Sequence, residues 1–436
     1  MNLLEFTIKR KFKILLLYIL FFISAVLSFN SYENISNQNS KIFKRESNGS
    51  YLLNQSNPTF NRFKSFIKFG NKINLWSRNI NFIVDVDIKL TYIMQAINLI
   101  KSETCLKFNM INSHSVKKQG IFFKLSNSYE SELGKQANKK IQVIYIQKII
   151  YNIGNILREL FHTLGVEYEY RRPDRNKYIF ILKKSYNSTQ SNQLNINYKY
   201  ATEIQYPPYD YGSLMHDNFN HDAKNSLNKI LIPLNYLYST TIGQNISPTF
   251  LDIKKLNFLY CSDICKKKRI KIICLNGGYQ DPKICRKCKC VYGFSGRHCE
   301  KMQRQRSICG KTTFLAEWYT STIELKGKMS CIFYLATYVG HKIGITIDYV
   351  NIEQKYVHVC QPTNSLEVKY EIDKSNTGPR FCFVNKKITF FSKDNLVLVY
   401  FNNEKGVGGF KLSFKRITTK INTLSLKRYN FVNKKK

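Results

Sequence analysis

Residues 158–169 read Arg158-Glu159-Leu160-Phe161-His162-Thr163-Leu164-Gly165-Val166-Glu167-Tyr168-Glu169. Positions 158 and 162 are four residues apart, so in a helix their side chains lie on one face, with Glu159 beside them. Gly165 suits the turn that ends a helix, because glycine adopts backbone conformations that are closed to other residues. The segment therefore predicts a helix that ends at a glycine turn.

This spacing resembles the metzincin pattern of zinc proteases, His-Glu-x-x-His-x-x-Gly-x-x-His, in which the histidines bind the metal and the glutamate acts as general base. Glu159 matches the base, His162 the second histidine and Gly165 the glycine. The other two ligand positions hold Arg158 and Tyr168. The resemblance therefore implies zinc as the family cofactor and a ligand set that this chain has changed.

Two further segments resemble the astacin zinc metalloendopeptidases. Residues 168–179 are similar to that family's His-Glu-x-x-Arg-x-Asp-Arg-Asp-x-Tyr-Ile extension. Residues 209–217 are similar to its Met-turn, which is usually written Ser-Ile-Met-His-Tyr. The resemblance places Met215 under the metal site and Asp217 where the family has a tyrosine that approaches zinc. It implies an α+β fold, a two-lobed astacin-like metzincin domain.

The resemblance extends over three more segments of this domain. Residues 76–85 resemble the first strand of the mature protease, residues 93–108 its first long helix, and residues 243–261 its closing helix. The resemblance implies a disulfide between Cys105 and Cys261. The family's usual second disulfide has no cysteines left here, so we expect a less rigid cleft, which favours a loss of catalysis.

The next six of the 12 cysteines resemble those of an EGF-like module, which is too small for a hydrophobic core and depends on its disulfides. A zinc ribbon around Cys285-x-x-Cys288 is the alternative, and an oxidising secretory route disfavours it. The resemblance implies the pairs Cys265–Cys285, Cys274–Cys288 and Cys290–Cys299.

The last four cysteines lie in a region of alternating strands, such as residues 343–349 and 396–401. This region resembles a CUB domain, an all-β sandwich. Residues 361–363, Gln-Pro-Thr, offer no carboxylate at the place where some CUB domains bind calcium, so calcium binding is not implied. The resemblance implies the pairs Cys309–Cys331 and Cys360–Cys382.

The N-terminus has the form of a secretory signal, because lysines and an arginine precede an apolar run over residues 14–29 that carries small residues near its end. A retained membrane anchor is the alternative, and no later segment is apolar enough to span a bilayer. We therefore expect a secreted, extracellular glycoprotein, with Asn-x-Ser/Thr sequons at Asn34, Asn48, Asn54, Asn187 and Asn245.

The predicted organisation is a signal peptide at 1–28, a short pro-segment or linker at 29–74, an astacin-like peptidase domain at 75–261, an EGF-like domain at 262–300, a CUB domain at 309–416 and a basic tail at 417–436.

The chain carries 68 basic and 29 acidic residues, a net charge of +39. Such a field favours anionic partners, such as sulfated glycans, acidic mucins or anionic lipid surfaces. Compositional drift in an AT-rich genome also explains the excess of lysine, asparagine and isoleucine. We expect no nucleic-acid partner, because the chain has the form of a secreted protein and contains no nucleic-acid motif.

Catalytic zinc needs three protein ligands and an open position for water. Arg158 has no lone pair to offer and would place a positive charge at the metal position. Tyr168 would bind only as phenolate, which is scarce at a pKa of about 10. Glu159 then has a structural alternative, an ion pair with Arg158 or Arg171. His162 has two alternatives: a hydrogen-bonded core histidine, or a rewired site in which His162, His216 and Asp217 bind zinc.

Three functions follow from these residues. The leading prediction is a secreted pseudoprotease that binds extended peptides, proteins or glycans without cutting them. The alternative is an active zinc metalloendopeptidase with a remodelled metal site. The third is a basic surface adhesin in which the charge matters and the cleft does not.

Overall fold

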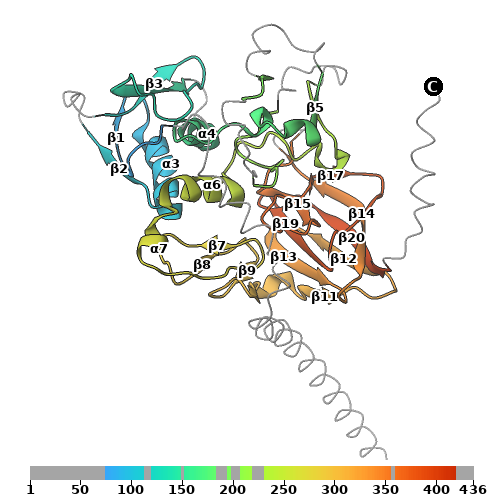
Figure 1. Cartoon of the computed structure of the whole chain (residues 1–436). Coiled ribbons are helices and arrows are strands. Elements are labelled where there is room, and N and C mark those ends of the chain that lie inside the picture. The colour runs from blue at the N-terminus through green and yellow to red at the C-terminus, as the bar shows by residue number, and fades with distance from the viewer. Residues whose placement is uncertain are drawn as a thin grey trace, which may run out of the picture. The chain divides into compact units, whose positions relative to one another are not determined.

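The computed structural model describes residues 74–111, 119–148, 152–182, 194–197, 207–218, 230–354 and 359–418 (Figure 1). All of them belong to one compact unit, Arg62–Lys436. The predicted signal peptide, nearly all of the predicted pro-segment, the basic tail from residue 419 and the sequons at 34, 48, 54 and 187 lie outside the described residues. No helix within the described ranges is both long and apolar enough to cross a bilayer.

The N-terminal lobe of the first domain is built on a four-stranded sheet in the order β2-β1-β3-β4. All three strand pairs are parallel. Buried apolar side chains alternate along the strands and pack with two helices into one core, which includes Phe82, Phe123 and Leu160. The elements are β1 Asn79–Val84, α3 Leu90–Glu103, β2 Lys107–Met110, β3 Gly120–Ser126, β4 Ile141–Gln147 and α4 Ile153–Thr163.

The first long helix, expected over residues 93–108, begins earlier and ends earlier, at Glu103. The hydroxyl of Thr104 donates to the carbonyl of Ile100 at 2.7 Å, and the next residue, Cys105, is bonded to Cys261. From Lys107 the chain pairs in parallel with β1. The expected helix was therefore wrong at its C-terminus, because sheet pairing that is not visible in the local sequence takes over there.

In the described residues of the second lobe the helices and strands before α6 are short, and helix α6, Phe250–Cys261, closes the lobe. Thr249 caps this helix in a capping box with Asp252. The closing helix expected from residue 243 therefore begins at Phe250. The other elements of this lobe are the 3₁₀ turns η5 Glu169–Arg171, η6 Arg175–Lys177 and η11 Tyr236–Tyr238, and the antiparallel pair β5 Ile179–Ile181 and β6 Leu231–Pro233. The short helix α7 Ile264–Lys267 follows α6 and carries Cys265 of the next module.

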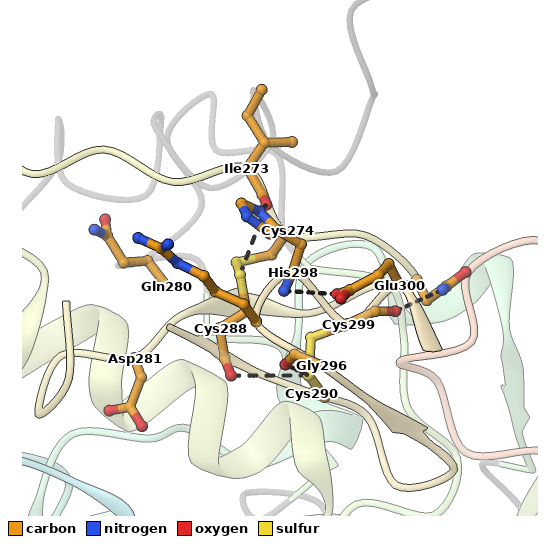
Figure 2. The surroundings of a disulfide bond; sticks show 12 residues. Ile273, Cys274, Gln280, Asp281, Cys288, Cys290, Gly296, His298, Cys299 and Glu300 are labelled. Carbon is orange, nitrogen blue, oxygen red and sulfur yellow. Dashed lines mark hydrogen bonds between the residues drawn. A yellow bond between two sulfur atoms is a disulfide. The ribbon is translucent and has the colours of Figure 1, made fainter. Parts of the chain in front are cut away.

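A small disulfide-rich module follows, with two short antiparallel strand pairs. Figure 2 shows four of its cysteines, Cys274, Cys288, Cys290 and Cys299, together with His298, whose ring Nδ1 is 2.8 Å from the carbonyl oxygen of Ile273. The module contains the disulfides Cys265–Cys285, Cys274–Cys288 and Cys290–Cys299. The strands are β7 Tyr279–Gln280, β8 Cys288–Lys289, β9 Phe294–Ser295 and β10 Lys301–Met302.

The C-terminal part is an all-β sandwich of two five-stranded sheets. One sheet has the order β11-β13-β19-β15-β16, and the other has β12-β20-β14-β17 with β18 also paired to β14. The disulfides Cys309–Cys331 and Cys360–Cys382 lie in this part. The predicted fold class is confirmed: an α+β domain, a disulfide-rich module and an all-β sandwich. After the turn η12 Ser307–Cys309, the strands are β11 Thr313–Leu315, β12 Ser321–Lys326, β13 Met329–Ala336, β14 Lys342–Ile352, β15 Asn364–Lys369, β16 Arg380–Phe381, β17 Phe383–Val384, β18 Ile388–Phe391, β19 Leu396–Asn403 and β20 Gly408–Ile417.

Candidate active site

Helix α4 carries the first two positions of the zinc-protease pattern. The side chain of Asn152 caps its N-terminus by accepting from the backbone of Gly154 at 2.8 Å and of Asn155 at 3.4 Å. The helix ends at a left-handed turn, with Gly165 at a φ of 90° and its N–H donating to the carbonyl of His162 at 2.9 Å. The glycine turn expected from the sequence is present.

Arg158 forms an ion pair with Asp217, 2.9 Å from Nη1 to Oδ2. The arginine side chain is 10% exposed and the aspartate side chain 33%. Burial disfavours the charged guanidinium, but the carboxylate of Asp217 together with Tyr168, Tyr170 and Glu159 outweighs burial, so the pKa of Arg158 is raised. Arg158, at the first ligand position, and Asp217, at the position of the family's tyrosine, therefore form an ion pair with each other.

His162 lies on the same face of α4 and is buried. Its Nδ1 is 3.1 Å from the hydroxyl of Ser131, and its Nε2 is 3.8 Å from a carboxylate oxygen of Glu167. The ring stacks on Tyr168, with the centroids 4.4 Å apart. Burial, followed by the charge of Arg171, lowers the pKa of His162 to about 3. This imidazole is therefore neutral at physiological pH.

Glu159, the position of the general base, accepts a hydrogen bond from Ser131 at 2.6 Å. Burial raises the pKa of its carboxyl group, although Ser131 and Arg158 act in the opposite direction. The sequence suggested an ion pair with Arg158 or Arg171, whereas the guanidinium of Arg158 is directed at Asp217. Ser131 was not predicted, because nothing in its local sequence marks a residue that meets α4 only in the folded chain.

Tyr168, the third ligand position, lies against the ring of His162. Its ring lies between His162 and Tyr170, the second of these at a centroid distance of 5.3 Å. Burial raises the pKa of the Tyr168 hydroxyl well above its usual range. The phenolate that a metal would need is therefore more costly here than in water.

The Met-turn packs against helix α4 and the segment that follows it. Met215 is fully buried in the core that includes Leu160 of α4, and its carbonyl accepts from the backbone of Glu169 at 3.0 Å. Asp252 of helix α6 fixes the turn by accepting from the hydroxyl of Ser213 at 2.6 Å and the backbone of Leu214 at 2.8 Å. The turn that positions Asp217 is therefore held by a second element.

Glu169, next to Tyr168, is the centre of a buried ion-pair network. Its carboxylate lies 2.7 Å from Arg172 and 2.6 Å from Lys255, and it accepts from the backbone of Asp210 at 2.9 Å. Burial opposes ionisation, but Lys255 and Arg172 outweigh it and lower the pKa of Glu169 to about 2. This network joins the segment after α4 to helix α6 and to the start of the Met-turn.

The residues present do not fit a catalytic zinc ion. Of the three positions, one is a paired guanidinium and one a tyrosine with a raised pKa, which leaves His162 as the one ordinary ligand. The rewired set is not assembled either, since Nε2 of His216 lies 2.7 Å from the hydroxyl of Tyr209. Within the described ranges, no group of three His, Cys, Asp or Glu side chains is placed to hold a metal ion.

Helix α4, its glycine turn and the Met-turn define an astacin-like peptidase domain. Residues 68–261 match the model of the astacin family of peptidases. The chain therefore contains a domain of the astacin peptidase family.

Nematode proteins are among the relatives. The chain is 28% identical over 344 residues to zinc metalloproteinase nas-34 of Caenorhabditis elegans, covering 78% of this chain and 54% of that protein. It is 27% identical over 326 residues to zinc metalloproteinase dpy-31 of Haemonchus contortus, covering 71% and 57% respectively. The chain thus spans about half the length of these relatives.

Solved structures with partial likeness include the hatching enzyme HCE-1 of Oryzias latipes, a zinc-protease, at 22% identity and a TM-score of 0.39, covering 44% of this chain and 98% of that one. A CUB1-EGF-CUB2 fragment of human MASP-1/3 has 19% identity and a TM-score of 0.21, and the match covers 36% of this chain and 57% of that fragment. The family assignment of residues 68–261 rests on the family model and the architecture.

Proposed function

We propose that this chain is a secreted pseudoprotease, whose astacin domain binds extended peptides or proteins and does not hydrolyse them. The observation that carries the proposal is the ion pair between Arg158 and Asp217 at 2.9 Å. A guanidinium beside His162 repels a divalent cation, and the carboxylate that could have bound the metal is engaged by that guanidinium.

The absence of a metal would remove the chemistry on which such a protease depends. Zinc lowers the pKa of its bound water to about 7 and polarises the peptide carbonyl. Glu159 without that water has no nucleophile to activate, and its carboxylate is hydrogen-bonded to Ser131. A folded domain without hydrolysis is the expected result, because fold and chemistry depend on different residues.

Peptide binding is supported by the segment that lies beside the edge strand β4. Glu130 pairs with Tyr145 of the edge strand β4 through one antiparallel bridge, and the adjacent Ser131 reaches Glu159. A segment at the edge of a sheet can accept an extended peptide through backbone hydrogen bonds. The net charge of +39 favours acidic peptides, or anionic glycans as a second class of ligand.

Secretion is supported by the cysteines, since all 12 are paired in disulfides. Disulfides persist in oxidising compartments and are rare in the cytosol. The predicted signal peptide and sequons are in accord with this route. We propose an extracellular location on these grounds.

The alternative is an active zinc metalloendopeptidase with a remodelled metal site. Two observations favour it: Glu159 stands beside His162 on α4, and the relatives are named zinc metalloproteinases. It requires Tyr168 or another group to displace Arg158 from the metal position.

The deciding experiment is metal analysis of the purified, disulfide-bonded protein after dialysis against zinc at neutral pH. We expect no stoichiometric zinc in protein whose circular dichroism shows a folded chain. About one tightly bound zinc per chain, with chelator-sensitive peptide cleavage that Glu159→Gln abolishes, would establish the alternative and overturn the proposal.

A further inference from the structure

Two loops at one end of the C-terminal sandwich expose large apolar side chains. Trp318 and Tyr319, between β11 and β12, are 75% and 53% exposed, and Tyr338 and Val339, between β13 and β14, are 49% and 83% exposed. The loops leave the sheets side by side, because β11 pairs in parallel with β13 up to Leu315 and Ala336. We call these four side chains the loop tip.

The loop tip is held in place by specific contacts. The hydroxyl of Tyr338 donates to Glu317 at 3.3 Å. Arg416 of β20 lies 3.7 Å from the carboxylate of Glu317 and 5.0 Å from the centroid of the Tyr338 ring. One ion pair and one cation–π contact therefore join both loops to the sheet behind them.

A tight turn presents Val339. The N–H of His341 donates to the carbonyl of Tyr338 at 3.1 Å, and Gly340 has a φ of 84°, a conformation that glycine adopts without strain. Val339 therefore occupies the outer corner of the turn, where its side chain is 83% exposed.

The composition of the loop tip suits the boundary between water and lipid. Tryptophan and tyrosine prefer the headgroup level, because each has an apolar ring with a polar group. Valine gains by entering the acyl region. The side chains project from turns, with about half to four fifths of their surface exposed, which suits a deformable surface better than a preformed protein recess.

Positive charge lies behind the loop tip. Lys342 begins β14 directly after the turn, and Lys415 lies opposite Gly344 in the adjoining ladder. Cations beside an apolar tip attract anionic headgroups, and the whole chain carries +39.

We propose that the loop tip is a peripheral membrane contact that inserts into the headgroup and acyl boundary of phospholipid bilayers containing anionic lipid. The contact would hold the full chain at a membrane surface without a spanning helix. It is independent of the state of the zinc-protease site.

The chain itself supplies the probe, because it has two tryptophans. Trp76 is buried, with its indole N–H donating to the carbonyl of Thr163 at 3.0 Å, whereas Trp318 is exposed. With vesicles of phosphatidylcholine and phosphatidylserine, the emission of the full chain should shift to shorter wavelength, and the protein should sediment with the vesicles.

Val339→Asp should weaken sedimentation about tenfold, because a carboxylate resists transfer into the interface. Val407→Asp is the matched control, since Val407 is 57% exposed on the β19–β20 turn, at the other end of the strands, and this variant should bind as the parent does. An unshifted emission, equal losses in both variants, or a shift produced by a heparin oligosaccharide and not by vesicles would overturn the proposal.

Discussion

The guanidinium of Arg158 and the carboxylate of Asp217 lie 2.9 Å apart, and each stands where the astacin pattern has a different residue. The arginine occupies the first histidine position, and the aspartate occupies the tyrosine position after the Met-turn. Either change alone would place one charge in a largely buried site. Together the two charges compensate each other, so the guanidinium of Arg158 can occupy the position where the family has a zinc ligand.

Breaking this pair should destabilise the domain. Arg158→Met removes the guanidinium from the carboxylate of Asp217, and we expect a loss of about 2 kcal/mol in the free energy of unfolding, below the range for fully buried pairs because the aspartate side chain is 33% exposed. A double-mutant cycle of Arg158→Met and Asp217→Asn, with the free energies of unfolding measured by chemical denaturation, should give a coupling free energy of about 1 kcal/mol or more. A coupling near zero would mean that the contact contributes nothing to stability.

Restoring the family's residues should restore metal binding. The triple variant Arg158→His, Tyr168→His, Asp217→Tyr offers three imidazoles, with His162 as the unchanged ligand, and we expect about one zinc per chain. Adding His162→Gln to the same variant is the control and should abolish the binding. A folded triple variant that fails to bind zinc would show that other residues also exclude the metal.

Acid stability should depend on Glu169. Its pKa falls from 4.5 to about 2 on folding, so in that window the unfolded chain binds more protons than the folded one. The charged carboxylate therefore stabilises the fold above pH 4.5, and this contribution, about 3 kcal/mol, is lost as the pH falls toward 2.

Glu169→Gln should accordingly be less stable than the parent at neutral pH and show a flatter decline between pH 4.5 and 2 in denaturation curves. Glu353→Gln is the control, because its pair with Lys405 is half exposed and should contribute little. Parallel acid limbs for Glu169→Gln and the parent would refute the role of the network.

The disulfide Cys105–Cys261 should be the main covalent restraint on the peptidase domain. It joins residues 156 apart in sequence, and closing so long a loop restricts the unfolded chain strongly. Replacing both cysteines by serine should cost about 4 kcal/mol, measured by denaturation of the oxidised protein. The pair Cys290–Cys299, with a sequence separation of 9, is the short-loop comparison. If its replacement by serines lowered the free energy of unfolding more than the loss of Cys105–Cys261, this explanation would be wrong.

Much of the fold could be predicted because its signals are local. The turn at Gly165 follows from one residue type at one place in the pattern. The strands of the sandwich follow from alternation, and residues 343–349 lie within β14. The helix expected to reach residue 108 was wrong, because pairing between β1 and β2 is a contact between distant segments.

The candidate site divides in the same way. The sequence by itself determined that two of the three ligand positions had changed and that Glu159 remained, since these are matters of residue type and spacing. Only the tertiary structure decided that Arg158 meets Asp217, that Ser131 engages Glu159, and that burial raises the pKa of Tyr168. Partners from separate segments and the degree of burial arise only when the chain packs, so no local pattern contains them.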